Sequence, residues 1–305
     1  MARQITILVI FLMAILGCGS STSLVNKITP DILKKQFKKN KQQFKKNVML
    51  LPLVDYSGLE PDTVDQTTSF LAKALQQSPN MIVHQSKKNM FLPSEIKGTE
   101  FGMVTPARLI ATADKENMHA LIISILYPIE SINKEKGIWP YKKDHTVFEV
   151  TVFLKVVDVI NKGLYLTSSE SEKIYIPVSK GSGQKKVILD DKLLIKAIQK
   201  IFSLQAIKVI RKLAETPWSG RIIALNHNLV VINAGKNVGI SVDQMFSVYS
   251  RGASINCYDG KTMEILGNKV GLIKVRSLSE KRSKAIIQSG GPFIEGQVVR
   301  PFYPQ

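Results

Sequence analysis

The most regular pattern in the chain is the alternation of apolar and polar residues along 145–160. A period of two is typical of a β-strand with one covered face. The turn Asn161-Lys162-Gly163 follows, and segment 164–176 predicts the antiparallel partner strand of a hairpin. The predicted covered face carries Phe148, Val150, Val152, Leu154 and Val156, and the other carries Glu149, Thr151 and Lys155.

Strands and helices alternate before this hairpin. Segments 48–55 and 119–129 are continuous apolar runs, as expected of buried strands, and 80–84 predicts a shorter one. Helical spacing of apolar residues after Asp62, and Pro106 following Thr105, predict two helices. Segment 191–214 has apolar residues at helical spacing behind Asp190-Asp191, a suitable cap. Residues 47–216 therefore predict a mixed α/β sandwich.

The pattern changes after 215–220, which reads "ETPWSG". Short apolar strands then alternate with turns rich in Gly, Asn and Asp, which predicts a small all-β, barrel-like module over 217–305. Gly235, Gly239 and Gly296 are expected at tight corners or at positions with positive φ. The fold class expected for the whole chain is α+β.

Residues 1–17 predict a secretory signal peptide. Arg3 precedes a twelve-residue apolar run, which is shorter than the roughly 20 residues that a membrane-spanning helix needs. The run ends in "ILGC", which resembles the bacterial lipobox, so Cys18 is the predicted site of lipid attachment. No Asp follows Cys18, which favours the outer membrane and predicts a protein anchored there by lipid, on the periplasmic face.

Residues 18–46 predict a basic tether between the lipid and the folded part. Leu33, Phe37 and Phe44 could share a helix face, so one interpretation is an amphipathic arm that binds anionic lipid or the cell-wall polymer peptidoglycan. The other interpretation is a solvated linker. The candidate anion-binding residues are Lys34, Lys35, Lys38, Lys39, Lys41, Lys45 and Lys46.

The formal charge of +18 on 305 residues favours acidic partners. Hydrophobic residues make up 44 % of the chain, enough to build a sizeable core. Nucleic acid is not an expected partner, because no helix-turn-helix, zinc-finger or aromatic-basic ribonucleoprotein motif is present.

The chain offers no motif for catalysis, a cofactor or a metal. His84, His119, His145 and His227 are not spaced as metal ligands. Segment 181–186, "GSGQKK", lacks the features of a phosphate-binding loop, and no Gly-x-Ser-x-Gly motif occurs. A non-enzymatic protein is expected, in which Cys257 is the only thiol left once Cys18 is acylated.

Two stretches carry a family resemblance. Segment 48–58, with the hairpin residues Val156, Asp158, Val159 and Gly163, resembles the domain shared by the N-terminal part of TolB and the curli-secretion lipoprotein family CsgG. The C-terminal stretch resembles the β-module of flagellar assembly protein T, through Asn233, Gly235, Gly239, Ile240, Asp243 and Phe246. The resemblance implies a periplasmic assembly protein whose relatives form rings around a secretion pore or the flagellar rod.

Three functional hypotheses follow. The first is an oligomeric assembly lipoprotein of an envelope machine such as the flagellar basal body. The second is a curli-like export component. Segment 128–145 is short and charged and carries two Pro residues, whereas segment 168–190 could form one weak hairpin, so two membrane-spanning hairpins do not fit and a channel is not expected. The third is a monomeric module that binds cell wall or lipid.

Overall fold

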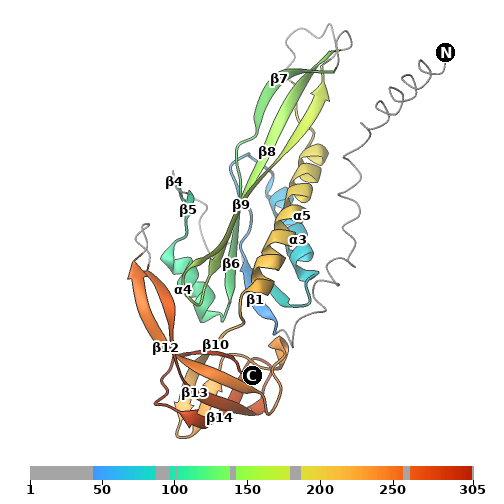
Figure 1. Cartoon of the computed structure of the whole chain (residues 1–305). Coiled ribbons are helices and arrows are strands. Elements are labelled where there is room, and N and C mark those ends of the chain that lie inside the picture. Colours follow the sequence, from blue (N-terminus) through green and yellow to red (C-terminus); the bar gives the residue numbers. More distant parts are fainter. Residues whose placement is uncertain are drawn as a thin grey trace, which may run out of the picture. The chain divides into compact units, whose positions relative to one another are not determined.

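The computed structural model describes residues 44–86, 97–99, 102–137, 142–178, 187–256 and 262–303. The chain divides into two units, Met1–Gln43 and Phe44–Gln305, and all described residues belong to the second. This unit is α+β: a mixed sheet with helices on both faces, and a closed six-stranded β-barrel (Figure 1). The predicted signal peptide, the predicted lipidation site Cys18 and most of the predicted tether lie outside the described residues.

The mixed sheet is built around β8 (Lys143–Asp158), which keeps the predicted alternation. Its C-terminal half pairs with β6 (Ala120–Leu126), and its N-terminal half pairs with β7 (Glu130–Lys136) on the same side. β9 (Leu164–Pro177) runs along its other side as the predicted hairpin partner. β1 (Lys46–Leu50) and β2 (Val54–Asp55) both pair in parallel with β6, and β3 (Met81–Gln85) pairs in parallel with β1.

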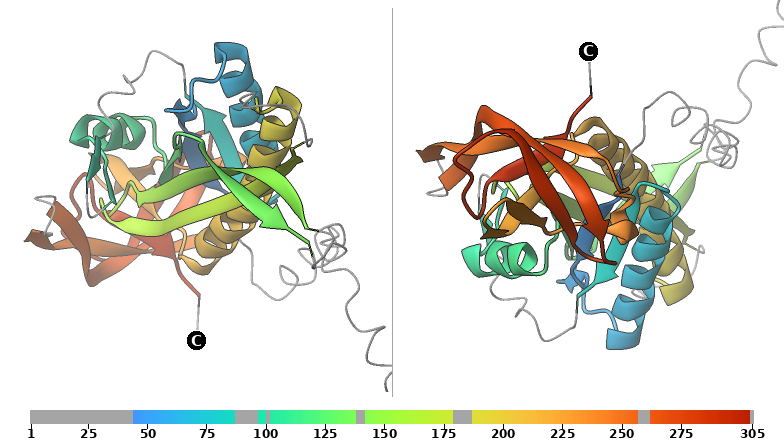
Figure 2. Two further views of the ribbon diagram at one scale, coloured as in Figure 1. Left: turned by 90° about the horizontal axis from the view of Figure 1, so that it is seen from above. Right: turned by 90° about the horizontal axis from the view of Figure 1, so that it is seen from below.

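Helices cover both faces of this sheet. Helices α3 (Pro61–Gln76) and α5 (Asp191–Glu215) pack against each other on one face of the sheet. α3 contacts β3, whereas α5 contacts β8 and β9, next to the buried residues Val150, Val152 and Leu154 of β8. α4 (Ala107–Lys115) lies on the opposite face (Figures 1 and 2). Asp190 caps α5 as predicted, with its side chain accepting a hydrogen bond from the Lys192 amide at 2.7 Å. A small ribbon of β4 (Lys97–Thr99) and β5 (Gly102–Val104) precedes α4.

Two expectations for this domain are wrong in detail. Segment 48–55 forms two strands instead of one, because Leu51–Leu53 leave the ladder between β1 and β2. α3 starts behind Glu60 with Pro61 in its first turn, so Asp62 is an acidic residue of that turn and not the cap. The structure also contains a strand that was not predicted, because segment 130–136 forms β7.

The C-terminal module is a closed barrel, in the order β10-β11-β14-β13-β12-β15. Closure of the barrel leaves no free edge, so the short strands β11 and β15 are each paired on both sides. Gly239 and Gly296 have φ of 93° and 84°, whereas Gly235 is extended and lies so close to Ser279 that a side chain would collide with its carbonyl. The strands are β10 (Gly220–Asn226), β11 (Leu229–Ile232), β12 (Met245–Asn256), β13 (Thr262–Leu278), β14 (Ser283–Gly290) and β15 (Val298–Pro301), with a 3-10 turn, η4 (Lys236–Val238).

Phe44 belongs to the core of this barrel and not to an amphipathic arm. Its ring lies 5.2 Å from that of Trp218 and 6.0 Å from that of Phe246, and only 4 % of the residue is exposed. The prediction that Phe44 shares a helix face with Leu33 and Phe37 is therefore wrong for Phe44. The segment just before β1 fills the barrel, although the rest of the barrel lies about 170 residues later in the chain.

Candidate functional site

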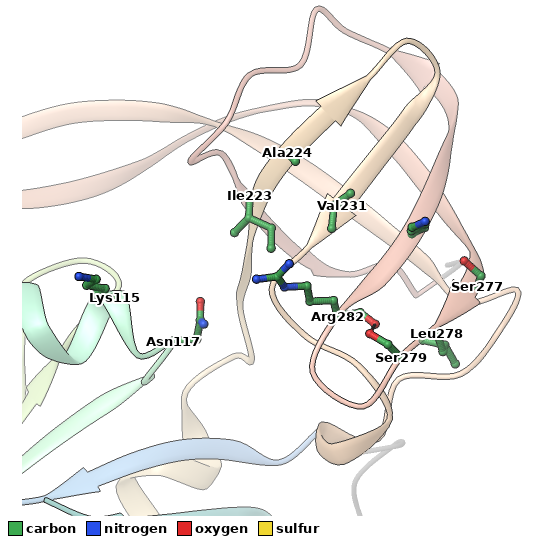
Figure 3. Close-up of a pocket in the computed structure, with 10 residues that line it drawn as sticks. Lys115, Asn117, Ile223, Ala224, Val231, Ser277, Leu278, Ser279 and Arg282 are labelled. Carbon is green, nitrogen blue, oxygen red and sulfur yellow. Dashed lines mark hydrogen bonds between the residues drawn. The ribbon is translucent and has the colours of Figure 1, made fainter.

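A groove of about 660 Å³ lies between the end of α4 and the barrel (Figure 3). Its apolar floor comes from Ile223, Ala224, Val231 and Leu278. The polar lining consists of Lys115, Asn117, Ser277, Ser279, Arg282 and Lys284. Three of these residues are cationic and none is acidic, so the groove is suited to an anion.

The α4 side of the groove is held to the barrel by hydrogen bonds. Asn117 ends the helix in the left-handed conformation, with φ of 58°. Its side-chain oxygen accepts a hydrogen bond from Nδ2 of Asn233 at 2.9 Å. Nearby, Arg221 donates to the carbonyl of Ile160 at 2.8 Å and pairs with Asp114 at 3.5 Å. These contacts join the end of α4 and the turn after β8 to the barrel beside the groove.

The barrel side of the groove is the tight turn between β13 and β14. The carbonyl of Arg282 accepts hydrogen bonds from the amide and the hydroxyl of Ser279, at 2.8 and 3.0 Å. The Ser279 carbonyl in turn accepts from the amide of Lys236. Figure 3 shows the Arg282 guanidinium directed from this turn into the groove, toward Ile223 and Asn117.

The arrangement is chemically equipped for binding. An arginine and two lysines can make charge-assisted hydrogen bonds to a carboxylate or phosphate, and arginine does so with two parallel bonds. The apolar floor can cover a hydrocarbon or sugar face of the same ligand. Among the described residues, no group of His, Cys, Asp and Glu could hold a metal ion.

Of the seven lysines predicted to bind anions, only Lys45 and Lys46 lie within the described residues. Lys34, Lys35, Lys38, Lys39 and Lys41 lie outside the described residues, as does Cys18. Lys45 is exposed, with its amide donating to the carbonyl of Val238 at 2.9 Å.

The prediction that Lys46 belongs to an exposed basic surface is wrong, because this lysine is buried. It is 6 % exposed and lies in β1, where its ammonium group donates to the Thr216 carbonyl at 2.5 Å and to the Leu213 carbonyl. These carbonyls belong to the C-terminal end of α5, where helices have unsatisfied acceptors and favour a positive charge. Lys46 therefore holds α5 to the sheet.

Lys46 is one of several titratable groups buried at the domain junction. Burial lowers the pKa of Lys46 to about 8, against the opposing effect of Asp158. Burial, and the nearby charge of Lys46, lower the pKa of His119 to about 3. Nδ1 of His119 accepts a hydrogen bond from the Asn47 amide at 3.1 Å, so the neutral ring has a structural role.

Sequence reasoning missed the groove. Its three cations come from two segments that lie far apart in the chain, and each segment is an ordinary polar sequence: "ADKEN" contains Lys115, and "SEKRSK" contains Arg282 and Lys284. Only the fold brings them together. The part of the chain that the structure describes contains no helix with both the length and the apolar character to cross a membrane.

No protein-family model and no curated protein sequence matches the chain. Among solved structures, it is similar to a neuraminyllactose-binding hemagglutinin homologue from Helicobacter pylori, at 16 % identity and a TM-score of 0.35, over 58 % of this chain and 91 % of that one. Lipoprotein GNA1162 from Neisseria meningitidis is 12 % identical, with a TM-score of 0.29, over 56 % and 99 %. The PelC dodecamer from Paraburkholderia phytofirmans is 16 % identical, with a TM-score of 0.29, over 54 % and 89 %. Likenesses of this size do not assign a function to the chain.

Proposed function

We propose that the chain is a non-enzymatic lipoprotein, anchored through Cys18 at the periplasmic face of the outer membrane, that self-associates as a scaffold of an envelope machine. The flagellar basal body is the kind of machine that the resemblance of the C-terminal module favours. The lipobox supports the anchoring. The structural observation that carries the self-association is the open edge of β9.

β9 is a long edge strand. It pairs with β8 from Leu164 to Pro177, and its other side has no strand partner among the described residues. In a strand, alternate residues direct their backbone N–H and C=O groups away from the paired neighbour. Such an edge is a template for another strand, and proteins that stay monomeric usually block or shorten it.

The side chains of β9 leave this edge accessible. Glu172 and Glu170 point toward α5, where Lys200 pairs with Glu172 at 2.6 Å and Lys208 pairs with Glu170. The opposite face carries the exposed small residues Ser169 and Ser171. Glu170 and Glu172 are paired with lysines of α5, and the outer face is small at Ser169 and Ser171. This stretch of the edge therefore offers little steric or electrostatic resistance to an approaching strand from a second copy.

The test is the mass of the protein in solution. Light scattering and negative-stain microscopy of the lipidated protein in mild detergent, and of a soluble Cys18→Ser form, are expected to show the same closed oligomer. The double variant Ser169→Lys/Ser171→Lys places two charges on the edge and is expected to give monomers. The matched control is Ser241→Lys/Ser289→Lys, two exposed serines of the barrel, which should leave the oligomer unchanged.

Two outcomes would contradict this proposal. Monomers of both the lipidated and the soluble wild type would exclude self-association by the folded unit. An oligomer that survives the β9 double variant would show that another surface forms the contact.

The basic groove favours a second candidate function, the binding of a carboxylate-bearing cell-wall polymer. Lys115, Arg282 and Lys284 supply three positive charges around an apolar floor. Co-sedimentation with purified peptidoglycan is expected to fall at least about tenfold in Lys115→Gln/Arg282→Gln/Lys284→Gln, because two or more charge-assisted hydrogen bonds are lost. Lys73→Gln/Lys192→Gln/Lys196→Gln removes the same charge from α3 and α5 and should bind normally. Equal losses in both variants would point to net charge alone and not to the groove.

A further inference from the structure

The sheet extends beyond the helices as a three-stranded ribbon of β7, β8 and β9 (Figure 1). Its register sets side chains of one face in rows across the strands. Ile132, Val147 and Tyr175 form one row, and Lys134 and His145 lie in the next row outward. Lys136 and Lys143 face each other in the last described row. We call the face that these rows form the basic ribbon face; it consists of Ile132, Lys134, Lys136, Lys143, His145, Val147 and Tyr175.

The outer rows of this face carry positive charge without compensation. Lys134, Lys136 and Lys143 are exposed, and none of the three has a carboxylate partner among the described residues. The acidic residues of the same strand ends, Glu135 and Asp144, alternate onto the opposite face, where Lys142 pairs with Glu135 at 3.3 Å. The two faces of the ribbon end therefore differ in sign.

An apolar row borders these lysines. Ile132 is 47 % exposed and Tyr175 is 43 % exposed, while Val147 between them is buried. The Lys136 ammonium lies 3.9 Å from the centre of the Tyr175 ring, which confirms that lysine and tyrosine share the face. Exposed aromatic and aliphatic side chains beside lysines suit the boundary between lipid headgroups and acyl chains, where rings are half-immersed and ammonium groups meet phosphates.

We propose that the basic ribbon face binds the headgroups of an anionic lipid surface, peripherally and without crossing it. This contact uses a surface separate from the groove and from the predicted tether, and it does not depend on self-association. Residues 18–43 span at most about 90 Å when fully extended, so an anchored protein could place this face on the membrane that holds its own lipid. A second contact of this kind would orient the folded unit on that membrane.

The test uses the soluble Cys18→Ser protein and vesicles of phosphatidylcholine, with or without phosphatidylglycerol. Binding is expected only to vesicles with phosphatidylglycerol, and it should weaken as salt is added. Lys134→Gln/Lys136→Gln/Lys143→Gln is expected to reduce the partition coefficient by roughly 100-fold, since each lysine at an anionic surface contributes about one factor of five. All forms keep the residues of the predicted tether, so a difference between them reports on the ribbon.

The matched control is Lys73→Gln/Lys196→Gln/Lys236→Gln, three exposed lysines on α3, α5 and η4. It should bind within about twofold of wild type. Ile132→Asn should weaken binding at high salt, where the apolar contribution dominates, and leave the fold intact because the residue is exposed. Ribbon and control variants that bind equally would overturn the proposal, as would vesicle binding that does not require phosphatidylglycerol. Binding of soluble polyphosphate without vesicle binding would also overturn it, in favour of a polyanion ligand.

Discussion

Val152→Asp is expected to abolish cooperative folding of the α/β domain. Val152 is fully buried in β8, paired with Leu126 of β6 and Glu170 of β9, and its carbonyl accepts a hydrogen bond from Nε2 of Gln205 on α5 at 2.9 Å. A carboxylate there has no partner, and its burial costs at least about 5 kcal/mol, comparable to the whole stability of many domains. Circular dichroism during urea unfolding should show a lost or strongly shifted transition.

Thr151→Asp is the matched control for this substitution. Thr151 is the preceding residue of β8 and points to the opposite face, where its hydroxyl contacts Ser171 at 2.8 Å. The same charge there stays in contact with water, so the free energy of unfolding should change by only about 1 kcal/mol. A soluble Val152→Asp protein with an unchanged unfolding midpoint would mean that Val152 does not lie on the face of β8 that α5 covers.

Acid is expected to destabilise the junction between the two domains through His119. The folded protein keeps the His119 ring neutral because its pKa is lowered to about 3, whereas the unfolded chain binds a proton near pH 6.5. The contribution to stability is therefore complete above pH 6.5 and is lost as the pH falls toward 3, at about 1.4 kcal/mol per pH unit. Between pH 7 and pH 5 the loss should reach about 2 kcal/mol, measured as the difference in urea unfolding free energy.

His119→Asn isolates this effect. An asparagine oxygen can replace Nδ1 as the acceptor for the Asn47 amide, but it does not titrate. The variant should be less stable at pH 7 and should lose less stability on acidification than wild type. The pKa of His84 is also lowered by burial, so only the difference between wild type and variant is informative. An identical pH dependence in both proteins would contradict the role of His119.

Lys46 acts in a separate pH range. Its pKa is lowered from 10.5 to about 8, so between these values the unfolded chain holds more protons than the folded one. Stability therefore rises with pH in this range. Acidic and alkaline titrations consequently report on two different groups of the same junction.

The sequence predicted the elements whose pattern is local. The alternation in β8 and the helical spacing and cap of α5 depend only on which residues face the core, and both were correct. β7 was missed because "ESINKEK" has a single apolar residue, Ile132, and therefore shows no alternation of apolar and polar positions. It is a strand because β8 continues past the end of β6 and leaves an edge with which β7 pairs. Pairing of this kind is a property of the partner strand, so periodicity does not reveal it.

The start of the folded part was misplaced for a related reason. Phe44 and Lys46 resemble the basic, weakly apolar residues before them, but their environment comes from residues more than 160 positions away, in α5 and the barrel. The groove has the same origin, because its cations come from the end of α4 and from the β13–β14 hairpin of the barrel, which are far apart in the sequence. Tertiary contacts of this range override the local spacing that sequence analysis uses.

The positions of Phe44 and Lys46 have a mechanical consequence. If the chain is held by a lipid at Cys18, any tension between membrane and folded unit enters at residue 44. The force acts first on the Phe44 ring inside the barrel and then on the contacts of Lys46 with the end of α5. It is therefore divided between both domains before it reaches the hydrogen bonds between β1 and β6. A pull on the anchor would thus tighten or break the joint between the domains, and would not simply peel one strand from the edge of a sheet.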